Sequence, residues 1–288
     1  MSSLKKYLVD KASALRASMS GGEQFSVRGY LGWRNVGDPA RITTQVFNTQ
    51  ATRRPASTVL LFVPGFASVP TMVDPGVLKQ QATHLGWDFA RFYHPELVKQ
   101  PSRLTYSSML ADIETVARAL PHQRIILAGS SFGAGMMPHA AQAINHAQPG
   151  RVAAMFGWMT VTPKALLDLF EQQPGYLEFL ARKTSALIVH SPTMKKPFPM
   201  THNQYESVRR LAETKLEPFD GPVLYLAGGR DPVGQPRYTF ELVAQLTDKP
   251  GCAQVRNDLG HVCPAQTIKA GLAELWRRLP DAPLAPRL

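Results

Sequence analysis

Residues 124–135, RIILAGSSFGAG, decide the fold of this chain. The stretch begins with a short apolar run typical of a strand buried on both faces, and residues 132–147 have the small apolar composition of a packed helix. Between them, Gly129 and Gly133 stand two residues before and two residues after Ser131, in the pattern G-x-S-x-G. Because a tight strand-to-helix turn leaves no room for side chains at those glycines, it lifts the serine hydroxyl above the sheet edge. We therefore predict that Ser131 is a nucleophile.

This turn has two other interpretations. Centring it on Ser130 would put Ala128 and Phe132 at the two glycine positions, where a phenylalanine side chain does not fit. A glycine-rich turn can also pack against its neighbours or cradle a phosphate, but the stretch has neither the G-x-G-x-x-G nor the G-x-x-x-x-G-K-[ST] pattern. The nucleophile turn centred on Ser131 is the interpretation that we adopt.

The rest of the chain alternates apolar strands with amphipathic helices, which predicts βαβ units and a mainly parallel sheet covered by helices on both faces. We expect strands at 24–32, 41–47, 57–64, 87–92, 124–128, 152–158, 222–227 and 253–257, and helices at 1–20, 75–85, 106–120, 132–147, 238–246 and 264–279. Residues 162–220 interrupt the alternation, with helical pieces at 163–171 and 204–214 and no buried-strand pattern. We predict a single α/β domain over residues 1–288, with an inserted lid at about 162–220.

A serine nucleophile needs a base and a carboxylate that orients it, and two strand ends supply them. Asp231 follows the buried strand of VLYLAGGRDPVG (223–234), and His261 follows the strand that ends in NDLGHVCP (257–264). In an open parallel sheet the reactive site lies at the carboxyl ends of the strands, where Ser131, Asp231 and His261 all fall. Their order along the chain, Ser then Asp then His, is the order expected of a serine site on this kind of open parallel sheet, and it differs from the orders in the two serine protease types. We predict that they form a catalytic triad.

Other polar residues fit chemical roles less well. Asp258 lies only three residues before His261 and is interpreted as a loop cap, and Cys263 has no base of its own and is interpreted as a structural thiol. No metal-binding spacing links the remaining histidines, so neither a metal nor a cofactor is predicted. These histidines are interpreted as surface or core residues: His84, His94, His122, His139, His146, His190 and His202.

Acyl transfer also needs two N–H groups aimed at the developing oxyanion. In FVPGFAS (62–68), the turn after the first buried strand can present the Phe66 N–H, and the Phe132 N–H follows the nucleophile. We predict this pair as the oxyanion hole. The alternative for Phe66 is an ordinary strand-to-helix turn.

Composition excludes several classes of protein. The 288 residues are 44% hydrophobic and 18% charged, which argues against a disordered chain or a coiled coil, and the longest apolar stretch is far too short to span a membrane. The net charge of +11 is spread over isolated basic pairs, so no nucleic-acid partner is expected. Two cysteines favour a reducing, cytoplasmic location. Residues 1–20 do not fit a secretory signal, although their basic amphipathic pattern resembles an organelle transit peptide.

Four motifs together resemble the alpha/beta-hydrolase superfamily over residues 24–279: VPGF at 63–66, GSSFG at 129–133, GGRDPV at 228–233 and GHVCP at 260–264. The resemblance implies the alpha/beta-hydrolase fold, the triad roles given above and a lid after the sixth strand. The short lid and the stretch PFPMTHNQYESVRRLAETKL are more similar to small-lidded carboxylesterases, including the acyl-glucuronide and acyl-protein esterase group.

The chain also departs from the superfamily pattern. Where members have an Asp and a Gly-x-Gly-type turn after the strand at 87–92, this chain has YHPELVKQPS, which leaves the substrate open. The HGGG motif of one lipase and esterase branch is absent, and a serine nucleophile argues against haloalkane dehalogenases and epoxide hydrolases.

The expected activity is hydrolysis of a small-molecule carboxylic ester or thioester through an acyl-enzyme. Acyl transfer by the same residues and a non-catalytic binding protein on the same fold are the alternatives. The lid carries an apolar set that either packs on the body or forms an acyl-binding wall: Leu166, Leu167, Leu169, Phe170, Tyr176, Phe179 and Leu180. It also carries Lys195, Lys196, Arg209 and Arg210, which are either solvated surface or a site for an anionic substrate. The acyl group, the leaving group and the oligomeric state stay open.

Overall fold

A single eight-stranded sheet forms the centre of the molecule. The computed structural model describes residues 33–34, 43–47, 56–65, 73–93, 105–193 and 197–280. The sheet has the strand order β1-β2-β4-β3-β5-β6-β9-β10. Its strands are β1 (Trp33–Arg34), β2 (Thr43–Phe47), β3 (Thr58–Val63), β4 (Asp88–Tyr93), β5 (Arg124–Ser130), β6 (Val152–Trp158), β9 (Val223–Gly228) and β10 (Ala253–Arg256).

From β4 to β10 the sheet is parallel, and at the other edge β2 pairs antiparallel with both β1 and β4. Every residue of β3 and of β9 is buried, as expected of strands that are covered on both faces. This confirms the solid apolar runs as parallel core strands. Because all six strands point the same way, their carboxyl ends meet at one edge of the sheet.

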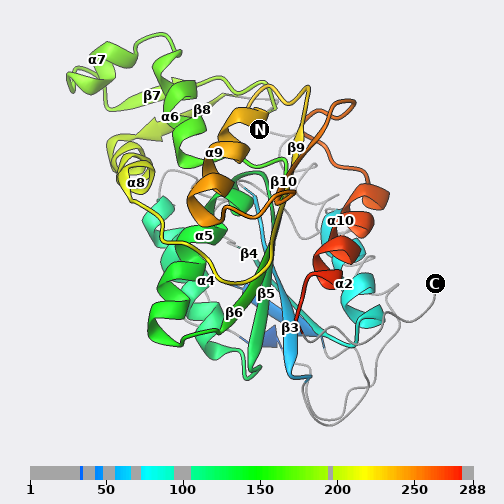
Figure 1. The fold of residues 1–288 in the computed structure, drawn as a ribbon. Helices are drawn as coiled ribbons and strands as arrows, with labels where there is room; N and C mark the ends of the chain where they lie inside the picture. The colour runs from blue at the N-terminus through cyan, green and yellow to red at the C-terminus, as the bar shows by residue number, and fades with distance from the viewer. Residues whose placement is uncertain are drawn as a thin grey trace, which may run out of the picture.

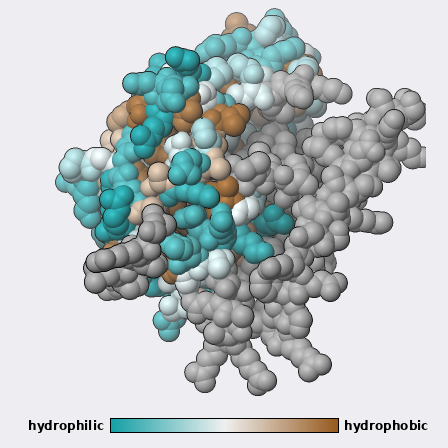
Figure 2. All heavy atoms as spheres, turned by 90° about the vertical axis from the view of Figure 1, so that its right-hand side faces the viewer, coloured by the Kyte–Doolittle hydropathy of each residue, from teal (hydrophilic) through white to brown (hydrophobic). Residues whose placement is uncertain are grey.

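Helices cover both faces of the sheet (Figure 1). One hydrophobic core joins the sheet to α4 (Tyr106–Ala119), α5 (Ser131–Ala147) and α9 (Pro236–Leu246), and a second joins its other face to α2 (Val73–His84) and α10 (Ala265–Arg277). The molecule is seen from the side of α2 and α10 in Figure 2, where hydrophilic and hydrophobic residues are interspersed over the described surface. No helix in the described ranges is both long and apolar enough to cross a membrane.

The lid segment, defined here as residues 162–220, lies between β6 and β9. It contains α6 (Pro163–Glu171), α7 (Tyr176–Leu180), β7 (Ala186–Val189), β8 (Phe198–Thr201) and α8 (His202–Glu213). Although the segment has no buried-strand pattern, β7 and β8, which are each only partly buried, pair as a separate two-stranded antiparallel sheet. The pattern hides this hairpin because each strand is four residues long, and Pro199, which pairs with Ile188, reads as a strand breaker.

The other predicted elements within the described residues appear with shifts of a few residues at their ends. The helix at 1–20 and the strand at 24–32 lie outside the described residues, in which the first strand is Trp33–Arg34.

Candidate active site

Ser131 occupies the turn where β5 passes into α5. Its φ of 51° lies in the left-handed region, which a serine adopts only where the surrounding structure requires it. The turn is tight: a Cβ atom on Gly133 would lie 2.3 Å from the Val63 carbonyl oxygen, and one on Gly129 would lie 3.0 Å from the Ala134 amide nitrogen. These contacts explain why both positions flanking the serine are glycines.

His261 joins the nucleophile to a carboxylate. The Ser131 hydroxyl lies 2.9 Å from His261 Nε2, and His261 Nδ1 lies 2.8 Å from Asp231 Oδ2. The three residues come from the loops after β5, β9 and β10, at the carboxyl ends of three parallel strands. The structure therefore brings the three predicted residues into one hydrogen-bonded chain.

Asp231 is held by its own loop. Its side chain is fully buried, and Oδ1 accepts hydrogen bonds from the Val233 and Gly234 N–H groups, both at 2.9 Å. With both N–H donors on Oδ1, Oδ2 is left to face the imidazole. The Nδ1–H tautomer of His261 can donate to Oδ2, which turns Nε2 toward the Ser131 hydroxyl.

A segment that the sequence did not single out, residues 159–161, connects the serine turn to the acid loop. The Met159 N–H donates to the Leu226 carbonyl at 2.8 Å, and the Val161 N–H donates to the Ser131 carbonyl at 3.0 Å. A Cβ on Gly234 would lie 2.5 Å from the Thr160 carbonyl oxygen. The segment follows β6 directly and carries no catalytic residue type, so no motif could have identified it.

The predicted oxyanion donors are described only in part. Phe132 is the second residue of α5, where an N–H group has no partner within the helix and the helix dipole favours an anion. Its ring is buried against Tyr106, with ring centroids 4.3 Å apart, which fixes the backbone there. Phe66 lies outside the described residues, so its N–H stays a prediction.

The less favoured candidates differ from the triad residues in their surroundings. Asp258 is exposed, and Cys252 and Cys263 are buried and form no disulfide. His122 is buried against Asp88 at 2.8 Å, at the amino ends of the parallel strands. Among the residues that the structure describes, no group of histidine, cysteine and carboxylate side chains is arranged to hold a metal ion.

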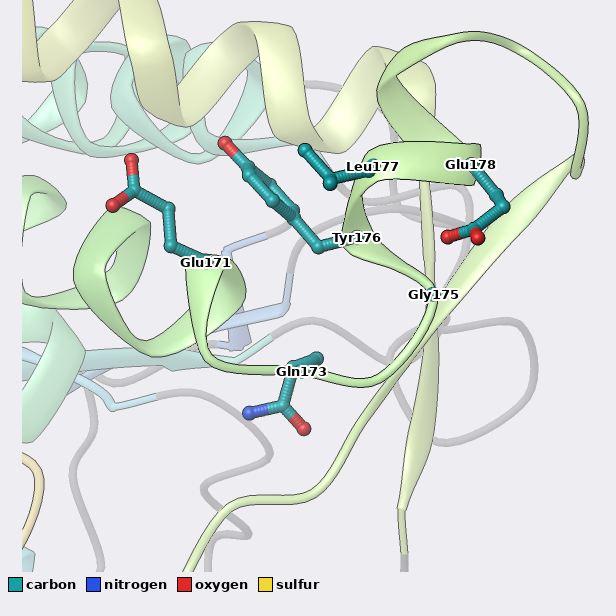
Figure 3. A pocket seen from close by; sticks show the side chains of 6 residues that line it. All are labelled: Glu171, Gln173, Gly175, Tyr176, Leu177 and Glu178. Atoms are coloured by element: carbon teal, nitrogen blue, oxygen red, sulfur yellow. The ribbon is translucent and has the colours of Figure 1, made fainter.

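The apolar set of the lid segment mainly packs inward. Phe170 and Phe179 are fully buried in the core, whereas Leu180 is exposed. In the basic set, Arg209 pairs with Glu206 and Glu213, and these carboxylates raise its pKa. Lys195 and Lys196 lie outside the described residues. A hollow of about 420 Å³ opens beside α7 (Figure 3), and its lining contains no residue of the hydrogen-bonded chain: Glu171, Gln173, Gly175, Tyr176, Leu177 and Glu178.

Comparison with known proteins gives structural likeness only. No family model matches the chain, and no curated protein matches its sequence. Mouse alpha/beta hydrolase domain-containing protein 10 is similar at a TM-score of 0.72 and 16% identity, over 87% of this chain and 100% of that one. A soluble variant of monoglyceride lipase from Saccharomyces cerevisiae is similar at a TM-score of 0.60 and 13% identity, over 90% and 98%. Est1E from Butyrivibrio proteoclasticus, solved with ferulic acid, is similar at a TM-score of 0.60 and 12% identity, over 81% of this chain and 95% of that one.

Proposed function

Because the chain has the alpha/beta-hydrolase fold, we propose that it is a serine hydrolase of carboxylic esters or thioesters, with Ser131, His261 and Asp231 as its catalytic triad. The observation that carries the proposal is the hydrogen-bonded chain from the Ser131 hydroxyl through His261 to Asp231. The positive φ of Ser131 supports it, because this strained conformation presents the hydroxyl at the catalytic edge of the sheet.

In the first half-reaction, the Ser131 oxygen attacks the carbonyl carbon of the substrate while His261 Nε2 takes the hydroxyl proton. The negative charge that develops on the carbonyl oxygen is stabilised by the N–H groups of Phe132 and Phe66. His261 then gives its proton to the leaving alcohol or thiol as the bond to it breaks, which leaves an acyl-enzyme on Ser131.

In the second half-reaction, His261 takes a proton from water, and the hydroxide oxygen attacks the acyl carbon. The tetrahedral intermediate collapses, the proton returns to the Ser131 oxygen, and the acid leaves. Asp231 holds the imidazole in place and stabilises its charged form throughout. An alcohol or amine in place of water would make the same residues an acyltransferase, which is the second candidate. That Lys195 and Lys196 bind an anionic substrate stays a prediction.

Ser131→Ala tests the nucleophile. The variant is expected to lose turnover of p-nitrophenyl esters and labelling by a fluorophosphonate probe while circular dichroism shows an intact fold. The matched control is Ser130→Ala: that serine precedes the nucleophile and its side chain makes no capping hydrogen bond to α5, so turnover should persist. If Ser131→Ala retains more than a few per cent of the activity, or the folded wild-type protein is not labelled, the proposal is wrong.

Asp231→Asn tests the orienting carboxylate. The amide can hold the imidazole in the wrong tautomer, so kcat is expected to fall by about 10⁴-fold. Asp258→Asn is the matched control, because Asp258 lies in the loop that delivers His261 but is exposed. Equal effects of the two substitutions would contradict the assignment of Asp231.

A further inference from the structure

The base of the lid segment is fixed to the body of the molecule. Lys164 on α6 pairs with Glu241 on α9 at 2.7 Å, and Ser207 on α8 accepts a hydrogen bond from the Ser107 N–H on α4, also at 2.7 Å. Both ends of the segment are therefore anchored to helices on the same face of the sheet, and α6 packs against α8. The outer part of the segment extends beyond these anchors, and within it we define the lid tip as residues 175–189, which hold α7 and β7 (Figure 1).

The lid tip exposes large apolar side chains to an unusual degree. Leu177 is 74% exposed, Leu180 43% and Ile188 49%. Five large apolar side chains are exposed among the residues that the structure describes, and these three lie within twelve residues of the chain. Clustered exposure of this kind marks an interaction surface, whereas isolated exposed apolar residues are ordinary.

The exposed residues are not part of the internal packing of the lid tip. Phe179 on α7 and Leu187 and Val189 on β7 are buried and form its inner side. Ile188 points to the other face of the two-stranded sheet, because side chains alternate along a strand. Leu177 and Leu180 are three residues apart on α7 and share one side of that helix. The structure is therefore complete without them, and their outer surfaces are free to contact a partner.

Charge and position indicate what kind of partner fits. Arg182 and Lys183 are exposed directly after α7, and the chain has no Asp or Glu between residues 179 and 205. The lid tip itself carries one acidic group, the exposed Glu178 on α7, against the two basic groups, and Glu171 lines the same hollow beside α7 (Figure 3). The whole chain carries a net charge of +11, which favours approach to an anionic surface.

The lid tip lies at the same end of the molecule as the loop between β10 and α10, which carries His261 (Figure 1). Val262, the next residue, is 82% exposed. A flat partner that contacts the lid tip would therefore face the catalytic edge of the sheet.

We propose that the lid tip docks on an anionic lipid surface. Leu177 and Leu180 enter the boundary between headgroups and acyl chains, and Arg182 and Lys183 contact the anionic headgroups. Docking needs no turnover, so it is independent of the proposed hydrolase activity.

Sedimentation with vesicles tests the apolar part. The full chain should bind vesicles of phosphatidylcholine and phosphatidylserine more tightly than vesicles of phosphatidylcholine alone. The double variant Leu177→Ser and Leu180→Ser should weaken binding at least about tenfold, because two apolar contacts with the lipid are lost. Phe240→Ser is the matched control: Phe240 is 46% exposed on α9, outside the lid segment, and its loss should change nothing.

The double variant Arg182→Glu and Lys183→Glu tests the charged part, and it should also weaken binding at least about tenfold at low salt. Its control is Lys249→Glu, an exposed lysine before β10, which should leave binding unchanged. Ser131→Ala should bind as the wild type does, and hydrolysis of a water-soluble ester should be unchanged in both lid-tip variants. These results separate docking from catalysis.

Three outcomes would overturn the proposal. The first is no binding to either kind of vesicle. The second is an equal loss of binding in Phe240→Ser or Lys249→Glu, which would indicate a non-specific effect. The third is a change of oligomeric state in the Leu177→Ser and Leu180→Ser variant by light scattering without lipid, which would show that the lid tip contacts a second copy of the chain.

Discussion

At the scale of single residues, the site depends on close backbone contacts as much as on the three polar side chains. Gly133 and Gly129 allow the serine turn, as the G-x-S-x-G pattern predicted. Gly234 has an equally tight position that the pattern did not predict: its N–H donates to Asp231 Oδ1, and its Cα packs on the Thr160 carbonyl. Gly133 is restricted by Val63, which is about as distant along the chain as Thr160 is from Gly234, so the difference is that Gly133 belongs to the known G-x-S-x-G turn and Gly234 belongs to no such pattern.

Gly234→Ala is expected to impair catalysis without unfolding the protein. The new Cβ would lie 2.5 Å from the Thr160 carbonyl oxygen and 2.9 Å from Asp231 Oδ2, so the acid loop must move. Because small displacements of catalytic groups lower the reaction rate strongly, kcat should fall by about ten- to a hundredfold. Gly76→Ala on α2 is the control: its Cβ would contact nothing within 4 Å, and activity should be unchanged. Full activity in Gly234→Ala would show that the loop tolerates the shift.

At the scale of elements, strands and helices with strong periodicity could be predicted from the sequence, and short ones could not. The strand at 152–158 was predicted at its observed bounds, because seven mostly apolar residues leave little choice. The hairpin of β7 and β8 was not predicted, because its strands are stabilised by contacts with α7 and α8 rather than by their own pattern. Helix α7 was not predicted either, because five residues are too few to show a helical pattern.

Helix α5 carries a buried histidine that should make stability depend on pH. Burial lowers the pKa of His139 to about 4 from its ordinary value near 6.5. Between about pH 6.5 and 4 the unfolded chain takes up a proton at this position and the folded chain does not, so acid favours unfolding. The loss in free energy of unfolding should reach roughly 3 kcal/mol by pH 4.

Urea denaturation of wild type and of His139→Gln, repeated across this pH range, measures the effect. The variant is expected to be less stable near pH 7, because it buries an amide in the core, but its stability should depend less on pH. The difference between the two profiles of unfolding free energy against pH gives the contribution of His139. Parallel profiles would show that this histidine does not titrate differently in the two states.

At the scale of the whole molecule, the parallel sheet separates the hydrogen-bonded chain of Ser131, His261 and Asp231 from a second buried polar cluster. The order of Ser131, Asp231 and His261 along the chain was enough to predict that they meet, because every parallel strand delivers its carboxyl end to the same edge. The opposite end was not predicted. There Asp88, at the start of β4, accepts hydrogen bonds from His122 Nε2 at 2.8 Å and from the Ala56 N–H at 3.0 Å. The sequence separation of these three residues hides the cluster.

Asp88→Ala should therefore reduce stability and leave catalysis intact. The substitution leaves the buried His122 ring and the Ala56 N–H without this carboxylate, which is expected to lower the free energy of unfolding by about 3 kcal/mol. Urea denaturation measures that loss. Ester turnover, at a temperature where the variant stays folded, tests whether catalysis is intact. Asp248→Ala, at an exposed aspartate after α9, is the control and should change neither quantity. A fall in kcat for folded Asp88→Ala would mean that the two ends of the sheet are coupled, because the cluster lies at the amino ends of the strands and the triad at their carboxyl ends.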